Sequence, residues 1–234
     1  MQKRVLLKIS GEQLAGKYEH GIDADFAGWL AEEIKTFAEN NVQVIIMVGG
    51  GNFVRGAQIA GHGLKRVTAD HMGMMATMIN AIALTDIFEA HEVPTRCLSN
   101  IFAQQVSENF SHRLAEKHLA AGRVVIVAGG VGRPYFTTDT AAVNLALELD
   151  CQAVYKATKV DGVYNKDPEQ YKDAVRLEHV DFKEAVDNDH IRVMDKAAMA
   201  LAMEHNLKIV IFDALAEENI RRVARGEHVG TEVS

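Results

Sequence analysis

The chain has 234 residues, with 25 basic and 32 acidic side chains and a formal net charge of −7. Apolar residues make up 48% and charged residues 24%, which excludes a disordered or low-complexity protein. The acidic balance argues against general nucleic-acid binding, which needs a basic face, but it is compatible with a small anionic ligand in a locally positive cleft.

Short β-branched runs alternate with helical patterns along the chain. In order, we expect a strand at 4–9, a helix at 25–39, a strand at 42–48, a helix at 67–91, a strand at 94–98, a helix at 107–121, a strand at 123–128, a helix at 140–149, a strand at 153–156, a helix at 195–204, a strand at 208–212 and a helix at 217–225. Continuous apolar strands separated by helices predict an α/β fold, with three α/β/α layers and a mostly parallel central sheet.

Capping residues support several of these boundaries. Asp23 and Asp195 are suited to cap the helices that follow them, and Gly122 and Gly226 lie where helices should end. No linker rich in Pro, Gly or Ser interrupts the pattern, so we expect one domain over 1–234. The turn-rich stretch 157–179 is expected to be a functional or mobile loop.

Cysteine usage and the apolar runs indicate a cytoplasmic protein. Cys97 and Cys151 allow only one pairing, and we expect both to be buried free thiols in a reducing compartment. The basic start of the chain precedes an apolar run too short for a signal peptide. The runs at 44–48 and 124–128 are too short to cross a membrane. We therefore expect no membrane partner.

Three predicted strands run directly into loops that contain glycine. Lys8–Gly11 follows the first strand, Gly49–Asn52 the second, and Gly129–Gly132 the strand at 123–128. Ligands of open α/β sheets bind beyond the carboxyl ends of the strands, and glycine allows backbone N–H groups to approach an anion closely. A single loop of this kind is more often a tight turn. Three together, with Lys8 and Arg55 nearby, favour phosphate binding.

Several familiar motifs are absent. No Gly-x-Gly-x-x-Gly follows a strand, and the near match to a phosphate-binding P-loop ends at Tyr18, where a hydroxyl ligand for magnesium is needed. No His or Cys pair has zinc-ligand spacing, so no protein-held metal is predicted. His112 and His118 are expected on an exposed helix face, and the methionines at 72–78 in the core or at an interface. On position alone, Lys8 either reaches solvent or points into the crevice.

The order of five motifs carries a resemblance. They are Lys8–Glu12 (KISGE), Gly49–Gly56 (GGGNFVRG), Asp70–Gly73 (DHMG), Pro134–Asp139 (PYFTTD) and Thr158–Tyr164 (TKVDGVY). The chain resembles, over about 5–231, the bacterial-type UMP kinases (uridylate kinases) of the amino acid kinase family. The resemblance implies an amino acid kinase-like fold, transfer of the ATP γ-phosphoryl group to UMP in de novo pyrimidine nucleotide biosynthesis, Mg²⁺ carried by the nucleotide, inhibition by UTP, and a homohexamer.

The resemblance also implies a role for individual residues. An amino-terminal lobe at about 1–150 would hold UMP, and a carboxyl-terminal lobe at about 151–234 would hold the ATP nucleoside. The ATP phosphates would meet Lys8, Ile9, Ser10, Gly11, Gly51 and Arg55; UMP would meet Gly50, Asp70, Val131, Gly132, Arg133, Pro134, Tyr135, Phe136, Thr137 and Thr138; and the adenine nucleotide would meet Thr158, Tyr164 and Asp167.

Phosphoryl transfer to UMP needs no general base, because the acceptor oxygen is already anionic. It needs in-line placement and positive charge, which Lys8 and Arg55 would supply. Asp139 would orient Lys8 or the metal, or cap the helix at Thr140. Asp70 and the Thr137–Asp139 run suit a ribose phosphate.

Two other classes of function stay open at this stage. One is a kinase of the same family that acts on a carboxylate or carbamate. The other is a non-catalytic protein that stores an oxyanion on the same scaffold. Lys8, Arg55 and Asp139 favour an enzyme over storage, because storage does not need groups that stabilise a transition state. The chain departs from the family pattern at Val131 and Arg133, where bacterial members often have Thr and Asn. The resemblance also implies activation by GTP, but the helix around Thr85–His91 lacks the basic residues of a GTP site, so we do not expect GTP to activate this protein.

Overall fold

The computed structural model describes residues 3–54, 63–166, 168, 170–188, 191, 193–216 and 218–234. The strands in this part of the chain are β1 (Lys3–Ile9), β2 (Val42–Val48), β3 (Thr95–Ser99), β4 (Glu108–Asn109), β5 (Val124–Ala128), β6 (Ala153–Thr158), β7 (Val163–Tyr164), β8 (Arg176–Leu177), β9 (His179–Val180), β10 (Lys208–Asp213) and β11 (Thr231–Val233). The helices are α1 (Gly11–Leu14), α2 (Ala24–Glu39), α4 (Arg66–Ala90), α5 (His112–Ala120), α6 (Thr138–Glu148), α7 (Phe182–Asp187), α8 (Lys196–Glu204) and α9 (Asn219–Arg225).

A nine-stranded sheet forms the centre of the molecule, in the order β4-β3-β5-β2-β1-β6-β10-β11-β9. Its strand pairs are parallel except β10 with β11. β1 lies in the middle, between β2 and β6. The predicted mostly parallel sheet is confirmed.

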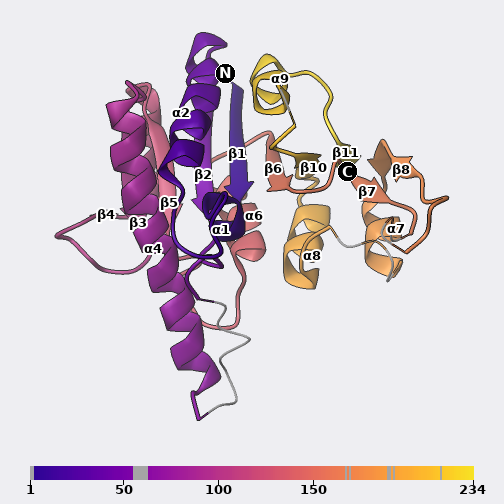
Figure 1. The fold of residues 1–234 in the computed structure, drawn as a ribbon, viewed down its shortest axis with the longest axis horizontal. Coiled ribbons are helices and arrows are strands. Elements are labelled where there is room, and N and C mark those ends of the chain that lie inside the picture. Colours follow the sequence, from indigo (N-terminus) through magenta and orange to yellow (C-terminus); the bar gives the residue numbers. More distant parts are fainter. Residues whose placement is uncertain are drawn as a thin grey trace.

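Helices cover both faces of this sheet (Figure 1). On β1, Val5, Leu7 and Ile9 pack into a core that includes α2, α4 and α9, whereas Leu6 packs into a core that includes α5, α6, α7 and α8. Alternate residues of a strand point to opposite faces, so an apolar strand supplies both cores. The three-layer α/β/α arrangement predicted from the sequence is therefore confirmed.

Some local predictions were wrong. The helix expected from 107 begins at His112, because Glu108 and Asn109 pair with β3 and Ser111 caps the helix. The stretch 157–179 is not without regular structure, since it contains β7, which pairs with β8. The helix α7 and the strand β11 were not predicted, because both are short.

The predicted caps agree with the structure. The Asp23 carboxylate accepts hydrogen bonds at the start of α2, and the Asp195 carboxylate does so at the start of α8. Gly226 ends α9 with a φ of 75°, and Gly122 follows α5 with a φ of 71°. Both φ values lie in the left-handed region that glycine tolerates.

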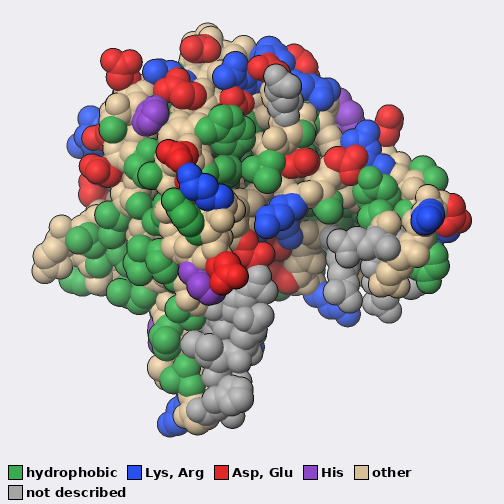
Figure 2. All heavy atoms as spheres, in the orientation of Figure 1, with side chains coloured by type: hydrophobic (Ala, Val, Ile, Leu, Met, Phe, Trp, Pro, Cys, Tyr) green, Lys and Arg blue, Asp and Glu red, His purple; other side chains and the backbone are tan. Residues whose placement is uncertain are grey.

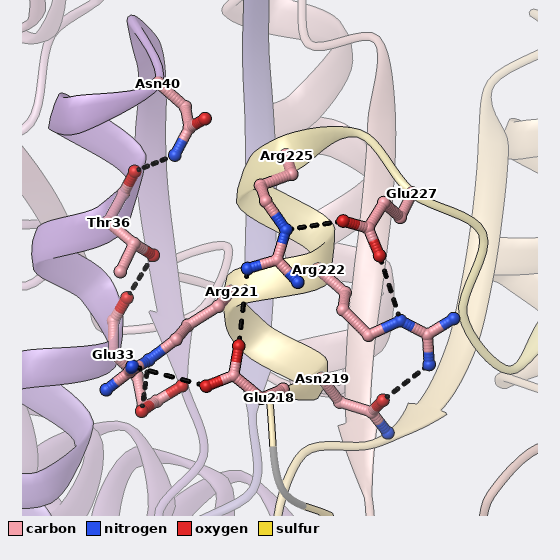
Figure 3. A network of polar contacts seen from close by, with 9 residues as sticks. All are labelled: Glu33, Thr36, Asn40, Glu218, Asn219, Arg221, Arg222, Arg225 and Glu227. Carbon is pink, nitrogen blue, oxygen red and sulfur yellow. Dashed lines mark hydrogen bonds and ion pairs between the residues drawn. The ribbon is translucent and has the colours of Figure 1, made fainter.

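Charged residues fasten the last helix to α2 (Figure 3). Arg221 of α9 donates from Nε to Oε1 of Glu33 at 2.9 Å, and the Glu33 side chain is only 6% exposed. Arg222 donates to Glu227 at 3.2 Å, and Arg225 contacts Glu218 at 3.3 Å. Only the first of these contacts joins α9 to α2, and the other two lie within the segment 218–227.

The cysteines are free and buried, as expected. Burial raises the pKa of the Cys97 thiol to about 11 and that of Cys151 to about 12, so neither is a reactive thiolate near neutral pH. His112 is exposed, but His118 is buried and contacts Glu108 and Arg123, so the prediction for His118 was wrong.

The long helix α4 has one apolar side in the core and another on the surface. Met74 and Met78 are buried, whereas Met75 and Ile79 are about half exposed, at 50% and 49%. Hydrophobic side chains gather in the region of α4 and the β3–β4 loop (left in Figure 2). Within the described residues, no helix is both long enough and apolar enough to cross a membrane.

Candidate active site

The first two glycine-bearing loops lie against each other at the carboxyl end of the sheet. Gly49 donates its backbone N–H to the carbonyl of Ile9 at 2.9 Å. A Cβ atom at Gly11 would lie 2.6 Å from the backbone nitrogen of Gly51, closer than real Cβ contacts. The loops after β1 and β2 therefore pack backbone to backbone, a contact that was not predicted from the sequence.

A pair of amides holds the second loop in place. Asn52 and Asn80 donate to each other's side-chain oxygen at 2.9 and 2.8 Å. Asn80 also donates to the carbonyl of Gly49 at 2.7 Å, and Asn52 to that of Gly21 at 2.7 Å. Asn80 is fully buried in α4 and was not singled out from the sequence. Its position in the middle of an apolar helix was the available signal, because a buried amide needs hydrogen-bond partners.

The third loop is attached to the same helix. The backbone N–H of Gly129 donates to Oγ1 of Thr77 in α4 at 2.8 Å. Asn100, just after β3, donates to the carbonyl of Gly130 at 2.6 Å. α4 thus positions the loops after β2 and β5 relative to one another, and all three loops meet at one end of the sheet.

Two lysines share one buried carboxylate beside these loops. Lys8 Nζ lies 2.8 Å from Oδ1 of Asp139, and Lys156 Nζ lies 2.7 Å from Oδ2. Exposed fractions of the three side chains are 10% for Lys8, 14% for Asp139 and 18% for Lys156. Lys8 therefore points toward Asp139 of α6 and does not reach out to solvent, which excludes one of the two orientations open from the sequence.

Strand register explains why the two lysines meet. Lys8 of β1 is directly paired with Lys156 of β6. Residues paired across parallel strands point to the same face, and this face carries α6, whose first turn holds Asp139. Lys156 was not recognised as a site residue. The signal was a lysine at the carboxyl end of a predicted apolar strand, but only the strand order places it next to Lys8.

The two ammonium groups keep the Asp139 carboxylate ionised. Burial by itself would raise the pKa of Asp139, but the ammonium groups of Lys8 and Lys156 outweigh burial and hold the pKa below its usual value. Burial lowers the pKa of Lys156, although Asp139 opposes this effect. With both lysines protonated, the cluster carries one surplus positive charge at the meeting point of the loops.

A second carboxylate supports the cluster from α8. Asp195 accepts hydrogen bonds from the hydroxyl groups of Thr137 and Thr140, the latter at 2.9 Å. Just before it, the carbonyl of Val193 accepts from Lys156 at 2.8 Å. The N-cap of α6 is Thr137, so the interpretation of Asp139 as an N-cap was wrong. Asp195 was predicted only as a cap, and its contact with α6 comes from the tertiary structure.

A cavity of about 140 Å³ opens on the other side of the loops, between α4 and the β5–α6 loop. Six of the predicted UMP residues line it, together with five that were not predicted. The predicted ones are Gly50, Val131, Arg133, Phe136, Thr137 and Thr138, and the others are Val54, Gly73, Met74, Thr77 and Gly130. Gly132, Pro134 and Tyr135 belong to the same loop without lining the cavity.

Asp70 lies near this cavity, in the first turns of α4. Its carboxylate accepts from Nε of Arg66 at 2.7 Å and from the backbone N–H of Tyr135 at 2.8 Å. Tyr135 has a φ of 70°, unusual for a residue with a side chain, and its ring lies 5.5 Å from the Arg66 guanidinium. Asp70 thus ties the β5–α6 loop to α4.

The predicted ATP residues that the structure describes extend from the loop after β2, with Gly51, across the end of β1 to β6 and β7. Ser10 caps α1, and the hydroxyl of Thr158, at the end of β6, donates to the carbonyl of Val160 at 2.7 Å. The Tyr164 hydroxyl, on β7, donates to Asp161 at 2.8 Å, and this hydrogen bond raises the pKa of Tyr164. Arg55 and Asp167 lie outside the described residues.

We expect Gly11→Ala to lower the free energy of unfolding by about 1–3 kcal/mol, because the added methyl group overpacks a tightly packed site. The added methyl group would meet Asn52 Oδ1 at 2.5 Å and backbone atoms of the second loop. Urea unfolding measures the loss. Gly28→Ala is the control, because its methyl group meets only the partly exposed imidazole of His91, at 3.0 Å. Equal stability of the two variants would contradict the close packing of the loops.

The chain is similar to known proteins over most of its length. Residues 3–213 match the amino acid kinase family. A similar solved structure is a UMP kinase from Bacillus anthracis, with 34% identity and a TM-score of 0.94, which covers 100% of this chain and 96% of that one. Another is a UMP kinase from Ureaplasma parvum, with 33% identity and a TM-score of 0.93, which covers 100% of this chain and 99% of that one. A uridylate kinase from Archaeoglobus fulgidus is 26% identical with a TM-score of 0.76, and each chain is covered in full. The chain belongs to the amino acid kinase family, as its motifs predicted.

Proposed function

We propose that the chain is a nucleoside monophosphate kinase that transfers the γ-phosphoryl group of ATP to UMP and releases ADP and UDP. The observation that carries this proposal is the buried cluster of Lys8, Lys156 and Asp139 at the meeting point of three glycine-bearing loops. Similarity over the full chain to proteins described as UMP kinases supports UMP as the acceptor.

The acceptor site in this proposal is the cavity between α4 and the β5–α6 loop, in the part of the chain before residue 150. Thr137 and Thr138 lie at the start of α6, where the positive end of the helix dipole favours a phosphate. Arg133 adds positive charge to the lining. Asp70, whose carboxylate is bonded to the loop residue Tyr135, would accept hydrogen bonds from the ribose hydroxyl groups.

The donor site extends along the carboxyl end of the sheet, from the loop after β2 across β1 to the segment after β6. The phosphates of ATP would bind at Lys8, Ser10, Gly11 and Gly51, and Arg55 would add a second cation. The nucleoside would bind in the part of the chain after residue 151, against Thr158, Tyr164 and Asp167. Nucleotides of open α/β proteins bind where neighbouring strands lead away in opposite directions. β1 meets this condition, because the chain leads from β1 to its neighbour β2 on one side, and β6 is its neighbour on the other side.

The chemical step follows from these placements. A phosphate oxygen of UMP bonds to the γ-phosphorus of ATP, and the bond from that phosphorus to the β,γ-bridging oxygen breaks, which leaves ADP. The attacking oxygen is already anionic, so the protein needs no base. Lys8 and Lys156 offset the negative charge on the transferring group, and Asp139 holds both ammonium groups in position.

A magnesium ion held by the nucleotide fits this donor set. Both oxygens of Asp139 already contact lysine ammonium groups, and the described residues contain no group of three or more His, Cys, Asp or Glu that could hold a metal. The phosphate oxygens of ATP are therefore its ligands in this proposal. When bound, Mg²⁺ supplies further charge neutralisation at the phosphates.

The resemblance supports three further proposals. The enzyme acts in the cytoplasm in de novo pyrimidine nucleotide biosynthesis, UTP inhibits it, and six copies assemble. The exposed apolar side of α4, with Met72, Met75 and Ile79, offers a surface on which copies can pack. Sedimentation velocity measures the assembly, and initial rates at increasing UTP measure the inhibition.

A coupled ADP-release assay with ATP and Mg²⁺ tests the proposed reaction, with UMP, CMP and dUMP as parallel acceptors. We expect strong turnover with UMP and much weaker turnover with the other two. The Lys8→Ala protein, purified in the same way, controls for a contaminating kinase of the expression host. If folded protein that binds ATP releases no ADP with any of the three acceptors, the proposal is overturned. That result would favour a carboxylate kinase or an oxyanion-storing protein.

A further inference from the structure

The side chain of Gln13 connects the end of β1 to the end of β6, beyond the point where the two strands stop pairing. The pairing of these strands runs from Leu6 with Val154 to Lys8 with Lys156. β1 then leads into the turn before α1, whereas β6 continues to Thr158. Gln13 of α1 donates from Nε2 to the carbonyl of Thr158 at 3.1 Å, and its Oε1 accepts from the backbone N–H of Ser10 at 3.2 Å.

Both the N–H donor and the carbonyl acceptor of the Gln13 amide form hydrogen bonds in this connection, and Gln13 is only 3% exposed. Oε1 also lies 3.2 Å from the Ser10 hydroxyl, so the acceptor end is fixed to the turn and the donor end to β6. A neutral primary amide has a donor and an acceptor side by side. A methionine side chain has about the same length as glutamine but has neither the N–H donor nor the carbonyl acceptor. An ionised glutamate keeps only the acceptor.

We infer that Gln13 is a positioning residue that sets the spacing between the two halves of the donor site and thereby tunes the affinity for ATP. The inference rests on the proposed function, which assigns the turn at Ser10 to the phosphates and the segment after Thr158 to the nucleoside of one molecule. A ligand that spans both segments loses contact at one end when their spacing changes. Gln13 does not line the acceptor cavity, so UMP binding should not depend on it.

The test compares Gln13→Met with Gln43→Met. Gln43 is a matched control, because its amide also joins separate segments: Nε2 donates to the carbonyl of Leu119 at 2.9 Å, and Oε1 accepts from Arg4 at 2.9 Å. It lies on β2, at the opposite end of the sheet. For Gln13→Met, we expect KM and the directly measured Kd for ATP to rise about tenfold, with KM for UMP within about twofold of wild type. Gln43→Met should change none of the three.

Gln13→Glu gives a signature that a merely structural residue would not give. The ionised carboxylate would face the carbonyl of Thr158 without a hydrogen to donate, whereas the protonated carboxyl group regains the donor. The Kd of this variant for ATP, divided by the wild-type value at the same pH, should therefore fall from pH 8 to pH 5.5. This comparison stays informative if Gln13→Met does not fold.

The outcomes separate this inference from the proposed function. If the wild type phosphorylates UMP and the Gln13 variants bind ATP as tightly as wild type does, the inference alone is overturned. Equal increases in KM for ATP and UMP would also overturn it, because they indicate general distortion of the site. If the wild type binds ATP but does not phosphorylate UMP, the proposed function fails, and the Kd values still decide the role of Gln13.

Discussion

Replacing Lys8 with alanine is expected to lower kcat roughly 10²–10³-fold, the effect of removing one group that stabilises transition-state charge. The Lys8 ammonium group is buried and held 2.8 Å from Asp139, so its position is fixed before ATP binds. Affinity for UMP should change little, because the acceptor cavity is lined by other residues. The stability of the fold should also be largely kept, since Asp139 and Lys156 remain as a one-to-one ion pair.

Steady-state kinetics together with equilibrium binding of UMP check this expectation. Lys17→Ala is the control for loss of a lysine as such, because Lys17 forms an exposed pair with Asp25 away from the cluster. Lys8→Arg separates charge from geometry, since the planar guanidinium keeps the charge but cannot occupy the same point. Turnover of Lys8→Ala within a few-fold of wild type would show that Lys8 does not act on the transferring group.

Asp139→Asn should instead damage the fold as well as the reaction. The substitution leaves two buried ammonium groups, on Lys8 and Lys156, without their shared counter-charge. Removing one partner of a buried ion pair typically costs about 3–5 kcal/mol of unfolding free energy. We expect a loss of this size near neutral pH, and a fall in kcat because the lysines are no longer held in position.

The pH dependence gives this prediction a second check. The pKa of Asp139 is lower in the folded state than in the unfolded state, so the carboxylate contributes stability above its unfolded pKa and loses it as the pH falls through the folded pKa. The difference in unfolding free energy between wild type and Asp139→Asn should therefore shrink in acid. It should also shrink in strong alkali, where a buried lysine of the variant can lose its proton.

Urea unfolding at acid, neutral and alkaline pH measures this difference. Asp25→Asn serves as control, since Asp25 also pairs with a lysine but is 84% exposed. Its variant should show no such maximum at neutral pH, because water screens an exposed pair. A constant difference between wild type and Asp139→Asn at every pH would contradict the coupling of the three charges.

The glycine-bearing loops could be predicted from the sequence, because glycine allows tight turns at the ends of apolar strands. The Lys8–Gly11 and Gly49–Asn52 loops follow apolar strands, and the carboxyl ends of parallel strands meet at one edge of a sheet. Their backbone contact at Gly11 was not predicted and comes from the tertiary structure. The rule about strand ends could not reveal Lys156, because β1 and β6 are more than 140 residues apart in sequence and their pairing depends on the whole sheet.

The errors have the same origin. His118 is on a helix with polar residues, which predicted exposure, but Glu108 and Arg123 enclose it in the folded chain. The stretch 157–179 has few apolar residues, yet β7 and β8 form by pairing with each other. In both cases, contacts with distant or weakly patterned segments decided the outcome, and local patterns do not contain that information.

Local periodicity, turn chemistry and short motifs were enough to predict the α/β class, the six longest strands of the central sheet, the glycine loops and the family. The tertiary structure alone decided that Lys8 faces α6, that Lys156 joins it on Asp139, and that Gln13 connects the turn at Ser10 to Thr158. Charge pairing and hydrogen bonding act over a few ångströms in space. Only strand order and register bring residues this far apart in the chain within that range.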